Sequence, residues 1–578
     1  MTTRIRSVFV GLAVAATLVA GTPAPVATQA NQQPSPATLV LRNGRIVTVD
    51  DTRPTAQAIA VNGDTIVALG TNAEIGRYVG PQTQVIDLNG QMAMPGFVES
   101  HGHFNGIGQA KLGLELMNTK SWDDIVGMVR DAVAKARPGQ WIVGRGWHQE
   151  KWTSVPQPNV EGFPTHDSLS AVSPNNPVIL THASGHASFA NAKAMELSNL
   201  TAKTANPNGG EILKDKAGNP TGLLRETASG LIRRGAGEPV PTAEEREAVA
   251  ERAVELADAE ILSKGVTSFQ DAGSSFGDVE RFKRMIDAGR LKSRLWVMIR
   301  GGGSPEQLSR GRLIDYGNKH LTVRAIKITV DGALGSRGAW LLAPYSDSVG
   351  SSGLGRESEL EQVRRTAQLA LDHGYQLCLH AIGDRANREV LDIFEEAFER
   401  NNRNGKDLRW RVEHAQHIHR DDIPRFGQLG VIAAMQGIHA TSDAPYVVAR
   451  LGAERAEEGA YVWKKLLDSG AVVANGTDAP VEDVDPIASY YATVTRRTAA
   501  GVEFFPDQKL SRMDGLKSYT LWAAYAGFEE HLKGSLEVGK LADITVLTKD
   551  ITTVPDNEIQ DAKVVYTIVG GKVVYTNR

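Results

Sequence analysis

The chain has 578 residues, of which 41% are hydrophobic and 22% charged, and its formal net charge is −4. These values are typical of a globular protein with several domains or one large barrel with attachments. No basic stripe indicates a nucleic-acid partner, and no acidic block indicates a solvating tail. The single cysteine, Cys378, excludes an intramolecular disulfide, so a large core has to provide the stability.

The first 30 residues have the three-part pattern of a secretory signal peptide. Arg4 and Arg6 precede an apolar run over residues 8–20, and small residues and prolines follow up to Ala30. The run is short for a membrane span, although an uncleaved anchor is the alternative. We therefore predict that residues 1–30 direct export to the periplasm or the extracellular space, with no stable membrane span after cleavage.

The two ends of the mature chain are both rich in β-forming residues. Residues 38–92 contain the turn signals Asn43-Gly44 and Asn62-Gly63, which are typical of hairpins. Residues 535–578 form a similar unit, in which Gly570-Gly571 separates the last two runs. Neither end has enough strands to bury a face alone. We predict that the two ends pair into one small β-sandwich; two unrelated end domains are the alternative.

The middle of the chain, residues 93–534, alternates strand-like and helix-like segments, which predicts parallel strands joined by helices. Apolar residues recur at helical spacing over 243–264, 358–373 and 386–400. Eight such units predict an α/β fold, a (β/α)8 TIM-like barrel. The stretch 104–264 is too long for one crossover, so we expect it to contain an insertion after the first strand, on the catalytic face. The eight strand candidates are 93–103, 265–271, 294–300, 323–331, 375–381, 409–415, 430–436 and 471–478.

The first strand candidate ends in His101-Gly102-His103. Alternate side chains of a strand share a face, so the two imidazoles converge and can bind a divalent metal. A lone His-x-His is common, and the other strand ends therefore have to supply the remaining ligands. The ends of barrel strands surround one mouth, where polar residues from several strands can meet. The candidate metal ligands are His101, His103, Lys327, His380, His414 and Asp478.

These motifs resemble the amidohydrolase superfamily of metal-dependent hydrolases. The resemblance is greatest to the YtcJ-like subgroup (Amidohydrolase family 3), which includes N-substituted formamide deformylases, and it covers most of the mature chain. It implies the same barrel and the same sandwich built from both chain ends. The motifs that carry it include Pro95-Gly96-Phe97 before His101-Gly102-His103, Gly222-Leu223-Leu224-Arg225-Glu226, His380-Ala381-Ile382-Gly383-Asp384, Glu413-His414-Ala415-Gln416 and Asp478-Ala479-Pro480.

The resemblance implies a site for two divalent metal ions, with zinc as the expected metal. His101, His103 and Asp478 would bind the more buried ion, whereas His380 and His414 would bind the second. Zinc lowers the pKa of a bound water toward about 7. Asp478 is then expected to act as the catalytic base, which takes the water proton and passes it to the leaving amine.

The resemblance also implies that Lys327 bridges the two metals as a carbamate. An ammonium group cannot donate a lone pair to a metal, whereas a carboxylated lysine offers two oxygens. If Lys327 is unmodified, a one-metal site formed by His101, His103 and Asp478 is the alternative.

The predicted function is hydrolysis of a C–N amide bond of the N-acyl or N-formyl type in a small-molecule substrate. A deaminase or an ester hydrolase is the alternative among enzymes, since the same ligands support several reactions. A catalytically inactive secreted binding or regulatory protein is the alternative of another class. Loss of metal ligands would mark that case, and all six positions are filled here. A homo-oligomer is compatible with the sequence.

The insertion and the later loops supply four candidate substrate contacts. Trp147 lies in the aromatic and polar segment 144–152, where packing between domains is the alternative role. His186 follows His182 by four residues, but the glycine between them disfavours a helix, so a second metal site is not expected there. The predicted substrate-contacting residues are Trp147, His186, Arg225 and His439.

Overall fold

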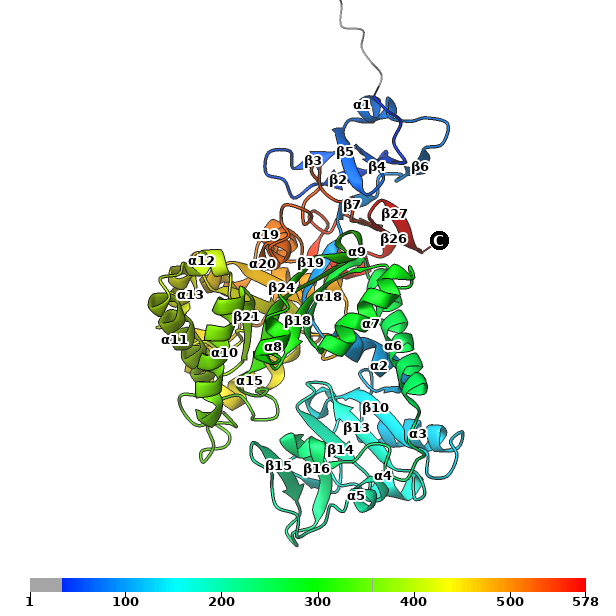
Figure 1. Ribbon diagram of the computed structural model, residues 1–578. Coiled ribbons are helices and arrows are strands. Elements are labelled where there is room, and N and C mark those ends of the chain that lie inside the picture. Colours follow the sequence, from blue (N-terminus) through cyan, green and yellow to red (C-terminus); the bar gives the residue numbers. More distant parts are fainter. Residues whose placement is uncertain (1–33, 356, 578) are drawn as a thin grey trace, which may run out of the picture. The chain divides into compact units, whose positions relative to one another are not determined.

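The computed structural model describes residues 34–355 and 357–577 of the chain (Figure 1). The predicted signal peptide, residues 1–30, lies outside these residues. From Pro36 onward the chain forms one compact unit. Within the described ranges, every helix is too short or too polar to cross a bilayer.

Eight parallel strands form a barrel in the order β8-β17-β18-β20-β21-β22-β23-β24. The first and last strands meet just beyond their ends, where the Asp478 N–H donates to the His101 carbonyl at 2.8 Å and the His103 N–H donates to the Ala479 carbonyl at 2.7 Å. The predicted (β/α)8 barrel is thereby confirmed. The strands are β8 (Phe97–Gly102), β17 (Val266–Ser274), β18 (Arg294–Arg300), β20 (Leu321–Thr329), β21 (Gln376–Ala381), β22 (Arg411–His414), β23 (Ile432–Gln436) and β24 (Val473–Gly476).

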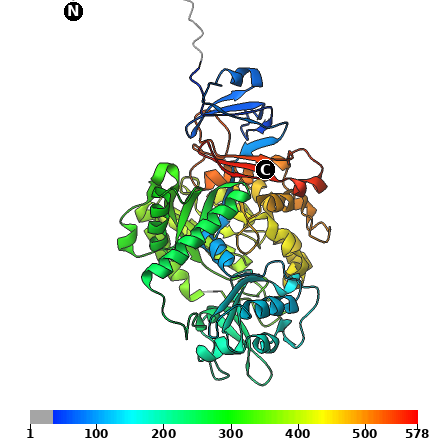
Figure 2. The same ribbon diagram turned by 90° about the vertical axis from the view of Figure 1, so that its right-hand side faces the viewer.

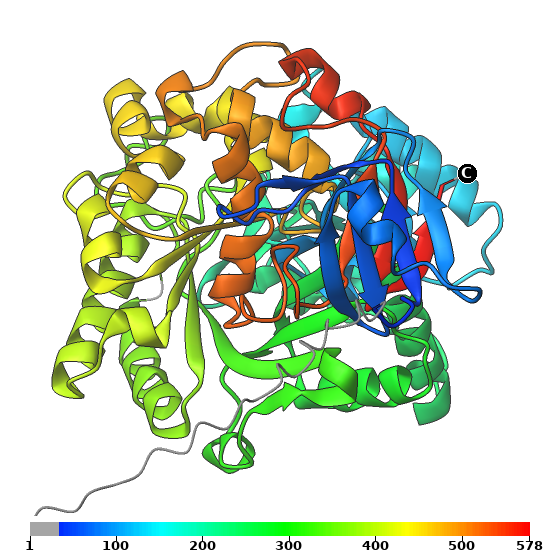
Figure 3. The same cartoon turned by 90° about the horizontal axis from the view of Figure 1, so that it is seen from above.

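Amphipathic helices surround the barrel (Figure 3). The three predicted helices are present as α6 (Ala243–Ser263), α10 (Leu360–His373) and α11 (Asp384–Arg400). Helix α6 starts with a capping box, in which Thr242 and Glu245 each bond the other's backbone N–H. The buried residues of α11 recur at helical spacing, which places one apolar face against the strands.

The two ends of the chain form a β-sandwich of two sheets, β5-β4-β1-β6 and β27-β26-β25-β7-β2-β3. The second sheet joins both ends, because β25 (Ile544–Leu547) pairs antiparallel with β7 (Met92–Pro95) (Figures 1 and 2). Apolar side chains from both sheets fill the space between them. The predicted sandwich is confirmed. The other strands are β1 (Leu39–Arg42), β2 (Arg45–Val47), β3 (Thr55–Ala56), β4 (Ala58–Asn62), β5 (Thr65–Gly70), β6 (Gln84–Asp87), β26 (Val564–Val569) and β27 (Lys572–Thr576).

The predicted strand 93–103 is in fact two strands that belong to different sheets. β7 lies in the sandwich and β8 in the barrel, and the chain passes from one to the other at Gly96. A Cβ atom on Gly96 would lie 2.2 Å from Oγ1 of Thr267, so a larger residue cannot make this close approach. The prediction of one continuous strand is wrong because the apolar run does not reveal this change of sheet.

The insertion after β8 is a mixed sheet with its own core, at the end of the barrel opposite the sandwich (Figures 1 and 2). Helix α3 (Trp122–Val133) packs its buried residues into that core, beside Trp147 and Phe189. The sequence predicts a helix over residues 122–136 and one short strand at 141–144 in this stretch, whereas the structure has a sheet of six strands. The sheet is β15-β16-β14-β13-β10-β9, formed by β9 (Leu114–Glu115), β10 (Ile142–Trp147), β13 (Val178–His182), β14 (Ala187–Ala190), β15 (Gly210–Lys214) and β16 (Pro220–Glu226).

Candidate metal centre

The six predicted metal ligands all lie at or near the C-terminal ends of barrel strands. A cavity of about 460 Å³ opens there, between the barrel and the insertion. His101 lies beneath this cavity, with its Nε2 3.6 Å from Oδ1 of Asp478. The other five predicted ligands line the cavity wall: His103, Lys327, His380, His414 and Asp478.

Asp478 stands at the centre of the histidines. Its Oδ1 lies 3.1 Å from Nε2 of His103, and its Oδ2 lies 4.0 Å from Nδ1 of His414. One ligand atom each from His101, His414 and Asp478 lie within 4.8 Å of one another. The ring of His380 lies 4.4 Å from that of His414, measured between centroids. The structure therefore brings together side chains from four strand ends.

The unpaired nitrogen atoms and the protonation of these histidines suit a divalent metal. Among the residues that the structure describes, the buried Nε2 atoms of His101 and His380 have no hydrogen-bond partner. Such atoms are rare in native proteins unless a water or an ion satisfies them. Burial lowers the pKa of His101 to about 4 and that of His414 well below its ordinary value. The imidazoles are thus neutral, with lone pairs available for a metal.

The carboxylate at the centre is ionised. Burial raises the pKa of Asp478, but the hydrogen bond from His103 lowers it, and the pKa lies well below its ordinary value. Neutral imidazoles around an ionised carboxylate are a suitable donor set for zinc and similar metals.

Polar partners fix the orientation of two of the histidines. Nδ1 of His101 donates to Oε2 of Glu413, and Nη2 of Arg411 donates to the same oxygen at 3.1 Å. Nδ1 of His414 donates to Oε1 of Gln436 at 2.8 Å. A metal-binding histidine commonly donates its second ring N–H in this way, which leaves Nε2 free for the metal.

The backbone is unusual at two of the strand ends. Neighbouring residues of a strand point to opposite faces, yet Glu413 and His414 both reach the barrel interior. This is achieved because His414 has φ +78° and Ala415 has φ +45°, so the chain leaves the strand direction there. Asp478 also has a left-handed backbone, with φ +58°. Such conformations in residues other than glycine are uncommon, and they concentrate at functional sites.

Lys327 lies on β20, and its side chain is buried in the wall of the cavity. Burial lowers the pKa of its amine. Its Nζ makes no hydrogen bond or ion pair with any residue in the described ranges. A buried amine with a lowered pKa has the reactivity that carbamate formation requires, since only the neutral amine is nucleophilic.

Two of the four predicted substrate contacts lie at the site. His186 comes from the insertion, and its ring lies 5.6 Å from that of His380. Its Nδ1 lies 2.8 Å from Oε2 of Glu226. His439 lines a smaller neighbouring cavity of about 50 Å³, where its Nδ1 lies 2.9 Å from Nε2 of Gln416. Both histidines thus line cavities whose walls also contain His380, His414 and Asp478.

The other two, Trp147 and Arg225, line neither cavity. Trp147 is fully buried in the insertion core and donates through Nε1 to the Leu180 carbonyl at 2.9 Å. Arg225 forms ion pairs with Glu161 at 2.8 Å and Glu211 at 2.6 Å. The structure therefore favours the packing role for Trp147 and an internal structural role for Arg225.

Arg145 lines the cavity although the sequence does not single it out. Regular alternation along β10 would place Arg145 and Trp147 on the same side. A bulge between them interrupts the register, and Gly146 within it has φ +110°. The bulge turns Arg145 toward the cavity. The glycine at position 146 permits the bulge, but the sequence alone does not show that a bulge forms there. Arg300 and Asp271 also line the cavity without having been predicted.

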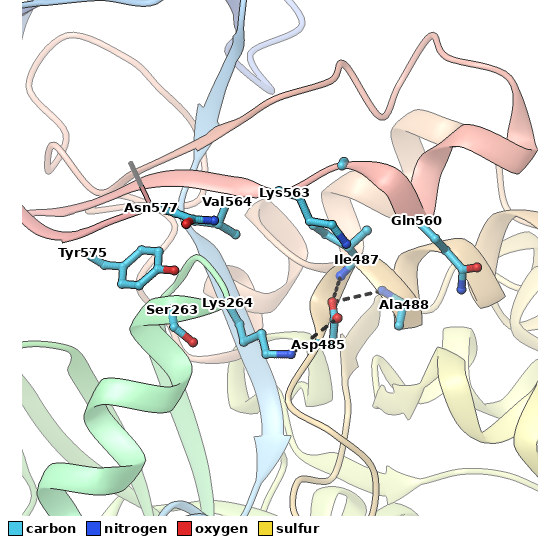
Figure 4. A pocket seen from close by; sticks show the side chains of 11 residues that line it. Ser263, Lys264, Asp485, Ile487, Ala488, Gln560, Lys563, Val564, Tyr575 and Asn577 are labelled. Atoms are coloured by element: carbon cyan, nitrogen blue, oxygen red, sulfur yellow. Dashed lines mark hydrogen bonds and ion pairs between the residues drawn. The ribbon is translucent and has the colours of Figure 1, made fainter. Parts of the chain in front are cut away.

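A further cavity of about 240 Å³ lies away from the metal centre (Figure 4). Two of its charged side chains are already engaged: Lys264 lies 3.7 Å from Asp485, and Asp485 caps helix α18 (Pro486–Thr495) by accepting from the N–H groups of Ile487 and Ala488. Its walls contain no histidine and no cysteine. This cavity has no donor set for a catalytic metal.

The sequence from residue 84 to residue 575 matches the profile of the family described as Amidohydrolase family. The chain belongs to the amidohydrolase family. The predicted enzyme class, a hydrolase that acts on carbon–nitrogen bonds other than peptide bonds, is confirmed by this membership.

Known amidohydrolases and related proteins resemble the chain over most of its length. Protein LONG AFTER FAR-RED 3 of Arabidopsis thaliana is 32% identical, over 93% of this chain and 92% of the relative. Putative amidohydrolase YtcJ of Bacillus subtilis is 29% identical, over 93% and 99%. N-substituted formamide deformylase of Arthrobacter pascens is 28% identical, over 93% and 98%. The predicted YtcJ-like subgroup is confirmed.

A solved structure supports both the fold and the dependence on metal. An uncharacterized metal-dependent hydrolase from Pyrococcus furiosus superimposes with a TM-score of 0.67 at 27% identity. The match covers 89% of this chain and all of the other. The chain therefore shares the fold of a metal-dependent hydrolase, and the cluster around Asp478 is its candidate metal centre.

Proposed function

We propose that the chain is an exported amidohydrolase that cleaves the C–N bond of an N-acyl or N-formyl amide in a small molecule. The observation that carries the proposal is the cluster of buried histidines with free Nε2 atoms around Asp478, at the mouth of the barrel. The relative named N-substituted formamide deformylase supports the N-formyl type of substrate.

Two divalent metal ions, zinc by preference, would be held by the strand-end side chains. When bound, zinc polarises the scissile carbonyl and lowers the pKa of a water toward about 7. Lys327 would contribute to both ions as a carbamate, which its buried amine, with its lowered pKa, can form. The proposed ligands are His101, His103 and Asp478 for one ion, His380 and His414 for the other, and Lys327 for both.

Asp478 is the proposed proton carrier. Its carboxylate is ionised, so it can accept a proton from the attacking water at Oδ1 and deliver it to the leaving nitrogen. Nε2 of His103 lies 3.1 Å from this oxygen. His186 closes the site from the insertion side, oriented by Glu226. The products are a carboxylic acid and an amine.

A substrate panel tests this proposal. Zinc-loaded protein is incubated with N-formyl amides, N-acyl amides, matched esters and amino-substituted heterocycles, and the released amine, alcohol or ammonia is measured. We expect amine and carboxylic acid from the amides. Ammonia from the heterocycles alone would instead establish a deaminase, and cleavage of the esters alone would establish an ester hydrolase.

Export is proposed from the signal-peptide pattern of residues 1–30. Intact mass measurement of protein recovered from the periplasmic or extracellular fraction tests it. We expect the mature chain to start at a residue between Pro25 and Asn31. An intact Met1 in that fraction would contradict cleavage.

A further inference from the structure

Two arginines without an acidic partner face the same cavity as the metal ligands. Arg145 comes from β10 of the insertion, and Arg300 is the last residue of β18 in the barrel. The two side chains therefore approach the cavity from its two walls. In the described part of the chain, neither guanidinium group has a carboxylate within 4.0 Å, the distance that defines an ion pair.

Main-chain carbonyls hold both guanidinium groups but leave donors free. Nη2 of Arg145 donates to the Ala183 carbonyl at 3.0 Å, while its buried Nε has no partner within the described ranges. Nε and Nη2 of Arg300 both donate to the Gly273 carbonyl, at 3.2 and 3.0 Å. A guanidinium has five N–H donors, so each arginine retains several for a ligand. Arg225, by contrast, is neutralised by two glutamates.

Each carboxyl group in the cavity wall has a partner other than these arginines, although the buried Oδ2 of Asp271 has none among the described residues. Asp478 faces the histidines, and Asp278 forms an ion pair with Arg281 at 2.5 Å. Asp271 accepts the N–H of Phe104 at 2.9 Å. Arg145 is half-buried, where a guanidinium without an ion-pair partner is costly, whereas Arg300 is exposed. The cavity thus presents two guanidinium groups that form no ion pair with a described carboxylate.

We propose that Arg145 and Arg300 bind a carboxylate of the substrate, so that the enzyme acts on amides that carry a carboxylate, such as N-acyl amino acids. This inference rests on the proposed function, because it places the carboxylate in the cavity that the metal ligands share. The guanidinium fork matches a carboxylate in two parallel hydrogen bonds, which a neutral group cannot reproduce. The specificity of the site therefore comes from the insertion and from β18 together.

Binding to the metal-free protein tests the inference without catalysis. Removal of metal ensures that the ligand carboxylate cannot bind zinc instead. N-formyl-leucine and its neutral counterpart N-formyl-leucinamide are compared by calorimetry. We expect the carboxylate to bind about 10- to 100-fold more tightly, as for a hydrogen bond between charged groups. Equal affinity for the two compounds would overturn the inference.

Substitutions test whether Arg145 and Arg300 cause the preference for the carboxylate. Arg145→Gln and Arg300→Gln should each remove most of the preference for N-formyl-leucine, and Arg145→Lys should restore only part of it because lysine lacks the planar fork. Arg420→Gln is the matched control, since Arg420 is exposed and pairs with Glu458. Arg300 is itself exposed, so its variant can be tested even if Arg145→Gln proves unstable. A preference that survives both glutamine variants would overturn the inference.

Turnover separates this inference from the proposed function. With zinc-loaded enzyme, we expect kcat/KM for N-formyl-leucine to exceed that for N-formyl-leucinamide by about 10-fold or more, and Arg145→Gln to bring this ratio toward one. If neither compound is hydrolysed but N-formyl-leucine binds through Arg145, the inference that the arginines bind a carboxylate is supported and the proposed function is wrong. If both are hydrolysed equally, the proposed function stands and the inference falls.

Discussion

The carboxylate of Glu413 accepts a hydrogen bond from Nδ1 of His101, and both side chains are completely buried. Arg411 neutralises the same carboxylate from 2.7 Å. Burial alone would raise the pKa of Glu413, but Arg411 and His101 hold it well below its ordinary value. The bond therefore fixes His101 with its Nε2 toward Asp478, which is the orientation that a metal requires.

Glu413→Gln should weaken metal binding, because glutamine accepts the same hydrogen bond without the negative charge that makes His101 a stronger donor. We expect about a 10- to 100-fold loss of zinc affinity, measured by competition with a chromogenic chelator. Glu529→Gln is a suitable control, since Glu529 is also a buried glutamate in an ion pair, 2.8 Å from Lys533. Unchanged affinity in Glu413→Gln would show that the pair does not orient a metal ligand.

Asp478→Asn should abolish turnover while the fold persists. An amide cannot carry the proton from water to the leaving amine, so we expect kcat to fall by at least about 100-fold. Circular dichroism and thermal unfolding check that the barrel is intact. A variant that retains near-normal rates on an N-formyl amide would remove Asp478 from the proton pathway.

Lys327→Gln should lower the metal content of the purified protein from about two zinc ions per chain to about one. Glutamine has no nucleophilic nitrogen and cannot form the bridging carbamate, so the second ion loses a ligand. Inductively coupled plasma mass spectrometry measures the stoichiometry directly. Two ions retained in the variant would establish that Lys327 does not bridge them.

The buried ion pair between Arg294 and Asp543 joins barrel strand β18 to the sandwich, with N–O distances of 2.7 and 3.0 Å. Asp543→Asn leaves the Arg294 charge unpaired, so we expect a loss of about 3–5 kcal/mol in the free energy of unfolding. Urea denaturation measures it. Asp561→Asn, at an exposed ion pair with Lys549, should change stability by less than about 1 kcal/mol.

The same pair predicts a dependence of stability on pH. Burial raises the pKa of Asp543, but Arg294 outweighs it, and the pKa in the folded protein lies below the ordinary value of 3.8. The contribution to stability is therefore complete above that value and is lost as the pH falls through the folded-state pKa. The difference in unfolding free energy between wild type and Asp543→Asn should shrink below about pH 4. A difference that stays constant down to pH 2 would contradict this account.

The sequence predicts the barrel, and the strand-end positions of the candidate ligands, for a physical reason. Parallel strands in a barrel place their C-terminal ends at one mouth, so residues such as His380 and His414 can be brought together from their position in each strand alone. The pairing of the chain ends follows in the same way, since neither end has strands enough to bury its own face.

Features that depend on local backbone geometry escape prediction. Gly96 divides an apolar run between two sheets, and the bulge at Gly146 turns Arg145 toward the cavity while Trp147 enters the insertion core. The left-handed backbone of His414 allows it and Glu413 to point into the barrel together. For Gly96 the deciding contact is with Thr267, a residue distant in the sequence, which strand periodicity does not contain.

We expect the strand-end side chains to hold the metal that hydrolysis of the amide requires. The most direct test is to remove the metal with a chelator, add zinc stepwise, and measure amine release from an N-formyl amide together with bound zinc. We expect the metal-free protein to release no amine, and the rate of amine release to rise until about two zinc ions are bound per chain. Hydrolysis by the metal-free protein at an undiminished rate would contradict this expectation.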